Sequence, residues 1–401
     1  MQKSRPAGKL PRWMIPWELP EDPRKPAFLY RAGNALSIQR HVPLPPFGRR
    51  YSPGASRPEA DRLDYPNDTQ TDWCVRFPPQ ESQFPPHPDG SVRTLHIVDE
   101  IACREEHGAQ IVRCRLDDDA GETFYVAKIY DALYYPSREW GGAPLDTTYS
   151  ADAHYSCECA AYEHLSQAGV DGRYTPKYFG SWTFDAPIPS VRPTDSAQVG
   201  GGKDYPTSRP VRMILTGWIR GTSMYSYLQT NKVNDFPYAW RLEVLAKAIE
   251  SESKLVFHGL LHNDFEPRNV LVVDAEPPAT STSATRDVPD VYIIDFNISY
   301  VLDSPYMRPK YQRSLRPTLP GNPMHEYWNN TCENFGSWVP VAYRRNRAAF
   351  RGWLKSRWGE AQGYSEPHEL MKQIHDYNAE VVYIPPESIP LDEAKVLDAH
   401  C

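Results

Sequence analysis

The order of apolar and polar residues separates a strand-rich part of this chain from a helix-rich part. Between residues 94 and 130, short apolar runs and alternating positions have the period of β-strands. Together with later runs, the pattern predicts five strands, at residues 95–98, 110–116, 124–130, 178–184 and 211–215. One helix is expected between the third and fourth strands, over residues 151–167.

The second half of the chain has mainly helical spacing. Apolar residues recur every three or four positions from Tyr238 onward, which predicts a long amphipathic helix. Two short apolar strands follow at 270–273 and 291–294, and the residues from about 325 to 380 are again helical and rich in aromatic side chains. Strands with one helix, followed mostly by helices, are typical of an α+β protein with two lobes.

The first 92 residues differ from the rest in their content of proline, of which the chain has 40. Each proline removes a backbone donor and fixes φ, so we expect neither long helices nor central strands here. Aromatic residues such as Trp17, Tyr30 and Trp73 can anchor the segment to a folded body. We interpret it as an extended, partly docked arm, and a fully disordered tail is the alternative.

Composition places the chain among globular proteins. Its 401 residues carry a formal net charge of −7, and 40% of them are hydrophobic. The mild acidity argues against nucleic acid as the main partner, and no segment approaches the ~20 apolar residues of a membrane span. The N-terminus lacks the apolar stretch of a signal peptide. The seven cysteines are an odd number scattered through the chain, which favours reduced thiols over disulfides. We therefore expect a cytoplasmic protein, with the nucleus as the alternative location.

Two low-complexity insertions interrupt the predicted elements. One lies at about 187–210 and is rich in Pro, Gly and Ser, and the other separates the strands at 270–273 and 291–294. Both are expected to be surface loops, because such compositions have little apolar surface to bury.

Lys128 and Glu158 are the first candidate pair. Lys128 lies within the predicted strand 124–130, both faces of which are apolar, so its side chain is expected to be partly buried. Glu158 precedes apolar residues by three, four and seven positions and so shares their helix face. A buried ammonium and a buried carboxylate in one small unit should pair. A plain salt bridge, or a lysine that reaches solvent, is the structural alternative.

A second group of polar residues follows the long helix. Asp264 and Asn269 lie in the segment His-Gly-Leu-Leu-His-Asn-Asp-Phe-Glu-Pro-Arg-Asn at 258–269, and Asp295 ends the second short strand. A carboxylate can accept the proton of an attacking hydroxyl, whereas an amide oxygen and a second carboxylate are ligands that Mg²⁺ prefers. The group therefore indicates phosphoryl transfer from a nucleotide, although any one aspartate alone would more simply cap a helix or form a turn.

The string His-Asn-Asp-Phe-Glu-Pro-Arg-Asn, with Asp-Phe-Asn downstream, resembles the catalytic core of the protein-kinase-like superfamily. Further details are similar to its aminoglycoside phosphotransferase and small-molecule kinase branch, including kinase-like proteins common in fungi. The match spans about 93–360 and is most specific over 254–299. It implies a two-lobed protein-kinase-like fold with a Pro-rich arm at 1–92, a strand-rich N-lobe at 93–216 and a helical C-lobe at 217–401.

The resemblance also implies roles for the residues of the second group. Asp264 resembles the catalytic base, and Arg268 supplies a positive charge in the same loop. Asn269 and Asp295 resemble the Mg²⁺ ligands. The implied activity is the transfer of the γ-phosphate of ATP to a hydroxyl of a small molecule or a protein.

The nucleotide contacts are implied in the strand-rich part. Lys128 resembles the contact to the α- and β-phosphates, and Glu158 resembles its partner. Thr216 and Trp218 lie in the segment that resembles the hinge whose backbone holds the adenine.

The chain also departs from the family pattern. Asn263 replaces the arginine that reads a phosphorylated activation loop in regulated protein kinases, and no Ala-Pro-Glu motif follows. Gly108 is the only glycine of the expected phosphate-covering loop at 101–110, which reduces close backbone approach to phosphate. A pseudokinase scaffold that binds protein partners without turnover is therefore the alternative function. The missing Ala-Pro-Glu favours a small molecule as the acceptor.

Overall fold

The computed structural model describes residues 17–52, 56–117, 123–189, 207–273, 288–367 and 369–389. The chain divides into two compact units. The strand-rich unit runs to Ala160 and includes Phe179–Trp218, and the helix-rich unit comprises Ala161–Tyr178 and the chain from Ile219 onward. The larger parts of both predicted insertions, 190–206 and 274–287, lie outside the described residues.

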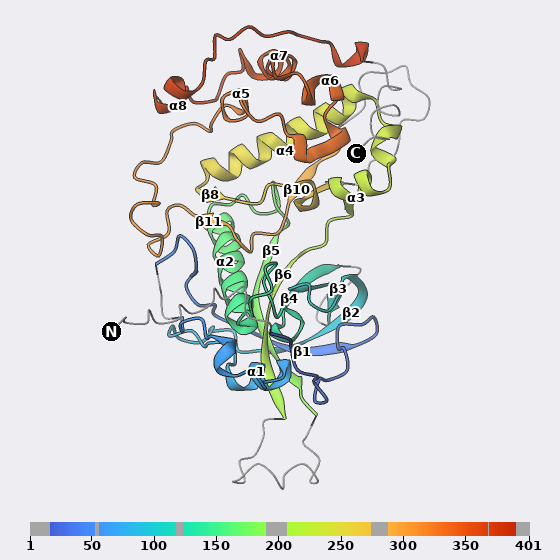
Figure 1. Cartoon of the computed structure of the whole chain (residues 1–401), viewed down its shortest axis with the longest axis vertical. Coiled ribbons are helices and arrows are strands. Elements are labelled where there is room, and N and C mark those ends of the chain that lie inside the picture. The colour runs from blue at the N-terminus through green and yellow to red at the C-terminus, as the bar shows by residue number, and fades with distance from the viewer. Residues whose placement is uncertain are drawn as a thin grey trace, which may run out of the picture. The chain divides into compact units, whose positions relative to one another are not determined.

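Six strands of the strand-rich unit form a closed barrel in the order β1-β2-β3-β4-β6-β5 (Figure 1). They are β1 (Ala35–Arg40), β2 (Val92–Ala102), β3 (Gln110–Leu116), β4 (Tyr125–Tyr130), β5 (Tyr178–Pro187) and β6 (Ser208–Gly217). The five strands predicted from the hydrophobic pattern correspond to β2 to β6, and only the predicted strand at 124–130 extends beyond its element, by one residue. The other elements here are η2 (Arg62–Asp64), α1 (Gln70–Arg76), η3 (Ala132–Tyr134) and the first part of α2 (Thr147–Gln167).

The predicted two-lobed protein-kinase-like fold is wrong, because the core of the protein is this closed antiparallel barrel. The sixth strand, β1, comes from the Pro-rich segment, where no central strand was expected. Leu36 pairs with Leu95 of β2, and Gln39 pairs with Thr183 of β5, so β1 joins both edges of the sheet. No proline lies within Ala35–Arg40, and its inward-facing residues are buried, so the local sequence allows a strand there.

A buried ion pair holds β4, β6 and the Pro-rich segment together. Arg209 of β6 contacts the carboxylate of Asp131, which directly follows β4, at 2.5 and 2.7 Å. The Tyr30 hydroxyl donates to the same carboxylate at 2.5 Å. All three side chains are buried. Both carboxylate oxygens therefore have partners, which come from two other parts of the chain.

Five short strands of the helix-rich unit form two small sheets, with the orders β10-β9-β7 and β11-β8. They are β7 (Gly221–Ser223), β8 (Leu260–Leu261), β9 (Val270–Val273), β10 (Val291–Ile293) and β11 (Tyr300–Val301). The helices are α3 (Met224–Gln229), α4 (Tyr238–Phe257), α5 (Pro323–Glu326), α6 (Val341–Arg344), α7 (Arg347–Trp358) and α8 (Glu369–Ile374). The 3₁₀ helices are η4 (Lys232–Asp235), η5 (Pro267–Asn269), η6 (Glu333–Trp338) and η7 (Pro386–Ser388).

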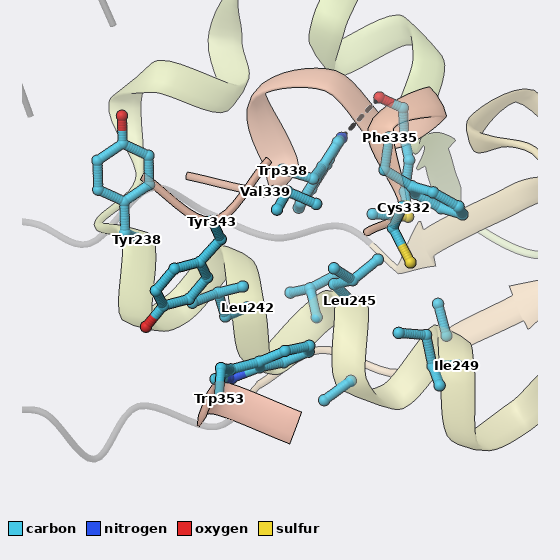
Figure 2. Close-up of a cluster of buried hydrophobic side chains, with 14 of the residues drawn as sticks. Tyr238, Leu242, Leu245, Ile249, Cys332, Phe335, Trp338, Val339, Tyr343 and Trp353 are labelled. Atoms are coloured by element: carbon cyan, nitrogen blue, oxygen red, sulfur yellow. Dashed lines mark hydrogen bonds between the residues drawn. The ribbon is translucent and has the colours of Figure 1, made fainter. Parts of the chain in front are cut away.

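The apolar face of α4 is the centre of the core in this unit. Figure 2 shows Leu242, Leu245 and Ile249 of α4 packed among Trp338 and Trp353. The Trp338 indole nitrogen also donates a hydrogen bond to the first residue of α3 at 3.0 Å. An indole that buries its rings and satisfies its N–H fixes both distance and orientation of the elements around it.

The hairpin of β9 and β10 positions the candidate loop. Val272 pairs with Val291, and the Val273 N–H donates to the Asp290 carbonyl at 3.0 Å. On the other side β9 pairs with β7, where a Cβ on Gly221 would lie 2.5 Å from the Val272 carbonyl oxygen. Only glycine permits this approach of two backbones.

Within the described residues, no helix combines the length and apolar character needed to cross a membrane.

Candidate functional site

Lys128 and Glu158 form a buried ion pair within the strand-rich unit. Lys128 lies on β4, where its backbone pairs with β3 and β6, and its Nζ is 2.5 Å from Oε2 of Glu158 on α2. Lys128 is 9% exposed and Glu158 is 1% exposed. The Tyr130 hydroxyl donates to the same Glu158 oxygen at 2.7 Å. Removing either charge would leave the other buried without compensation, which is costly.

Thr216 and Trp218 lie at the end of β6 in the same unit. Thr216 is buried and pairs with Val126 of the neighbouring strand β4. The Trp218 N–H, which a hinge would offer to adenine, donates to the Phe124 carbonyl at 3.2 Å. The Trp218 N–H is therefore already engaged within the protein and is not available to bind adenine.

His262 braces the candidate loop of the helix-rich unit. Its Nε2 donates to the carbonyl of Ile294 at 2.9 Å, and its Nδ1 accepts from the Asp264 N–H at 3.2 Å. The two bonds together select the tautomer with hydrogen on Nε2. The ring is fully buried and packs against Phe296 with centroids 5.0 Å apart. The start of the loop is therefore fixed to the residue that precedes Asp295.

The Asp264 carboxylate has partners on both oxygens. Asn269 Nδ2 donates to Oδ2 at 2.8 Å and also to the Asp264 carbonyl at 2.9 Å. Arg268 Nη2 lies 2.6 Å from Oδ1. Asn269 is buried, whereas Arg268 is exposed. The structure thus brings Asp264, Arg268 and Asn269 together, and both bonds of Asn269 use its nitrogen rather than its amide oxygen.

A backbone hydrogen bond joins the residue before Asp295 to Asn269. The Ile294 N–H donates to the Asn269 carbonyl at 2.9 Å, so the strand end and the loop are joined one residue before Asp295. Asp295 has a φ of +69°, a left-handed conformation that costs energy for a residue other than glycine. The amide oxygen of Asn269 and the carboxylate of Asp295 are hard donors that suit Mg²⁺. The described residues contain no group of three or more His, Cys, Asp or Glu side chains placed to hold a metal ion.

A cavity of about 270 Å³ lies beside the loop, within the helix-rich unit. Phe265, which follows Asp264, lines it together with Glu252, Glu326 and Tyr327. The Asn334 amide donates to the Phe265 carbonyl at 3.2 Å and fixes this wall. This cavity was not predicted from the sequence.

A signal for Glu252 was present in the sequence. Glu252 stands seven residues after Leu245 and three after Ile249, and so lies on the apolar stripe of α4. An acidic residue on an apolar stripe indicates a buried or functional carboxyl group.

Glu252 makes stability depend on pH. Burial raises its pKa to about 7, the Tyr327 hydrogen bond opposes the rise, and the Glu326 carboxylate adds to it. A raised carboxyl pKa contributes stability below pH 4.5 that is lost as pH rises through about 7. We expect Glu252→Gln to be more stable than the wild type at pH 8, by about 3 kcal/mol, and about equally stable near pH 4.5. Urea unfolding at several pH values measures this difference.

Glu243→Gln is the matched control, since Glu243 lies on the same helix but pairs with Arg357 at the surface. Its unfolding should follow the wild-type pH profile. An unchanged pH profile in Glu252→Gln would contradict the assignment.

A comparison with models of known protein families finds no match, and a comparison with curated proteins also finds none. The function must therefore be inferred from the side-chain geometry within each unit.

Proposed function

We propose that this protein is a phosphotransferase that moves the γ-phosphate of ATP to a hydroxyl group in a Mg²⁺-dependent reaction, with Asp264 as the base. The observation that carries the proposal is the fixed environment of Asp264. Its carboxylate lies 2.6 Å from the Arg268 guanidinium and 2.8 Å from the Asn269 amide, in a loop braced by buried His262. Positioning rather than covalent chemistry dominates phosphoryl transfer, so such bracing suits the reaction.

The residues of the loop divide the chemistry between them. Asp264 orients the acceptor hydroxyl and takes its proton. Arg268 stabilises the carboxylate and adds a positive charge where the transferred group carries negative charge. Asn269 and Asp295 are the residues that would hold Mg²⁺, which neutralises charge on the phosphates when bound.

In the strand-rich unit, Lys128 is the proposed phosphate contact. Glu158, which also accepts a hydrogen bond from the Tyr130 hydroxyl, pairs with the ammonium group, so this group is fixed before any ligand arrives. A preoriented charge loses little side-chain entropy on binding. Thr216 and Trp218 are proposed to lie along the adenine, with side-chain rather than Trp218 N–H contacts. These roles rest on side chains and do not require the kinase fold, because function depends on the site.

A scaffold without turnover is the second candidate function. The engaged Trp218 N–H favours it, since that donor is unavailable to adenine. The braced Asp264 loop opposes it, because binding a partner requires no ordered base.

For the phosphotransferase, the acceptor is proposed to be a hydroxyl group of a small molecule or of a protein.

Nucleotide binding distinguishes the two candidates. We expect ATP with Mg²⁺ to raise the melting temperature, since a ligand at 100 times its Kd stabilises the folded state by about 2.7 kcal/mol. In the Lys128→Met/Glu158→Gln double variant, which leaves no unpaired buried charge, we expect most of this shift to be lost. Thermal-shift assays against each ligand-free variant measure the effect.

Arg31→Met, which removes an exposed cation from the same unit, should keep the full shift. If millimolar ATP and Mg²⁺ shift neither the wild type nor the control, the scaffold function is favoured. A full shift in the double variant would instead remove Lys128 from the nucleotide site.

A further inference from the structure

A second cavity, of about 510 Å³, lies within the helix-rich unit. Residues 172–174, the part of α4 from Lys247 to Lys254, and residues 290–292 line it. None of the residues proposed for phosphoryl transfer contributes to its wall. Its volume lies in the range of small-molecule binding sites, roughly 300–1,000 Å³.

Backbone hydrogen bonds fix the walls of this cavity. The Ile293 N–H of β10 donates to the Tyr174 carbonyl at 2.8 Å, and the Gly172 N–H donates to the Thr175 carbonyl at 2.8 Å. The turn that carries Arg173 is thereby joined to a strand and closed on itself. A ligand would therefore meet a site that is already formed, and little ordering would be needed on binding.

The charges of the lining are unevenly matched. Lys247 lies 3.2 Å from the Asp290 carboxylate, so these two neutralise each other. The Glu250 carboxylate accepts from the Trp358 indole at 2.9 Å and lies 3.8 Å from an Arg357 guanidinium nitrogen. Both acidic residues of the wall therefore have partners.

Two cations of the wall remain. Arg173 and Lys254 have no carboxylate within 4.0 Å in the described part of the chain, and each lies instead over a tyrosine ring, at 5.1 Å from Tyr174 and 5.2 Å from Tyr364. A guanidinium and an ammonium group on one cavity wall attract a multiply charged anion.

His258, at the end of α4, lies close enough to the two cations of the wall for their charges to affect its pKa. Burial lowers the pKa of His258, and the positive charges of His164, Lys254, Arg173 and Arg313 lower it further. Two of these four groups are the unpaired cations of the cavity wall. Both cations of the wall therefore lie near one imidazole ring.

We propose that this cavity binds a small organic phosphate monoester, with Arg173 and Lys254 on the phosphate group. The cavity is much larger than a phosphate group alone, so space remains for an organic part. Tyr174 and Tyr292 line that space and can stack against a ring, and the Ser251 hydroxyl on α4 can donate a hydrogen bond. None of Asp264, Arg268 and Asn269 lines this cavity, so the proposed binding is a property additional to the proposed reaction.

Phenyl phosphate is the probe, with inorganic phosphate and phenol as comparisons at constant ionic strength. We expect phenyl phosphate to bind the full-length protein more tightly than either comparison in isothermal titration calorimetry. Arg173→Gln and Lys254→Gln should each weaken binding about tenfold, because each removes charge-assisted hydrogen bonds to the phosphate. Arg173 is exposed and Lys254 is half-buried, and neither is part of an ion pair in the described residues, so folding should be retained, and circular dichroism checks this.

Two controls separate this site from the proposed nucleotide site. Lys232→Gln, which removes an exposed cation elsewhere in the unit, should bind phenyl phosphate as the wild type does. The Lys128→Met/Glu158→Gln double variant should also bind it unchanged, whatever the outcome with ATP. Equal binding of phenyl phosphate by the wild type and both cavity variants, or no binding at millimolar concentration, would overturn the proposal. If inorganic phosphate bound as tightly as phenyl phosphate, the proposal that the cavity recognises an organic group would be overturned.

Discussion

Asp264→Asn is expected to lower the rate of phosphate transfer by about 10²–10⁴-fold, the usual contribution of a general base. Asparagine keeps the size of the side chain, but its single amide oxygen can accept from Arg268 or from Asn269 and not from both in their present positions, so the melting temperature of the variant is measured to check that the fold is retained. It cannot take the proton of the acceptor. The measurement is the turnover of labelled ATP with a metabolite extract and with generic protein substrates.

The control is Glu266→Gln, which removes a carboxylate two residues away in the same loop. It should retain most of the activity, whereas ATP binding should persist in both variants. Full activity in Asp264→Asn would show that another group takes the proton, even though the loop is braced as described. Loss of activity in both variants alike would indicate a general effect of loop charge.

Asp131→Ala is expected to destabilise the strand-rich unit by about 3–5 kcal/mol, the usual effect of leaving a buried charge without its partner. The variant removes both acceptors of the Arg209 guanidinium, which is 4% exposed. It also removes the acceptor of the Tyr30 hydroxyl, and so weakens the attachment of the Pro-rich segment. Urea unfolding followed by circular dichroism measures the loss.

The matched variant is the double replacement Asp131→Leu/Arg209→Met, which removes the charges together. Apolar residues of similar volume often replace a buried ion pair at little cost, so this variant should be markedly more stable than Asp131→Ala. If the single variant is as stable as the wild type, the pair does not hold the barrel together.

The local pattern in the sequence predicted most elements of the fold but not its closure. The strands β2 to β6 and the helix α2 follow from alternation and helical spacing. The segment of β1 has the same alternation, with Leu36 and Ile38 buried and their neighbours exposed, but the prolines around it outweighed the signal. Its pairing with β5 joins residues about 140 positions apart in the sequence, and no local pattern indicates such a contact.

The candidate site could be predicted in part, for a similar reason. The pairing of Lys128 with Glu158 follows from two apolar surroundings that each contain one charge. The contacts of Asp264 with Asn269 and Arg268 are local and follow from spacing. The engaged Trp218 N–H and the Glu252 cavity depend instead on which residues meet in three dimensions, which one sequence does not specify.

The β9–β10 hairpin has a practical consequence. The Val273–Asp290 hydrogen bond and the Val272–Val291 pair fix the register of the two strands within the described residues. Since the entropy of closing a loop grows slowly with its length, the spacer between the two strands can be trimmed or exchanged for a fluorescent reporter at a small cost in folding free energy. The Ile294 N–H would still donate to the Asn269 carbonyl, because this bond lies outside the spacer.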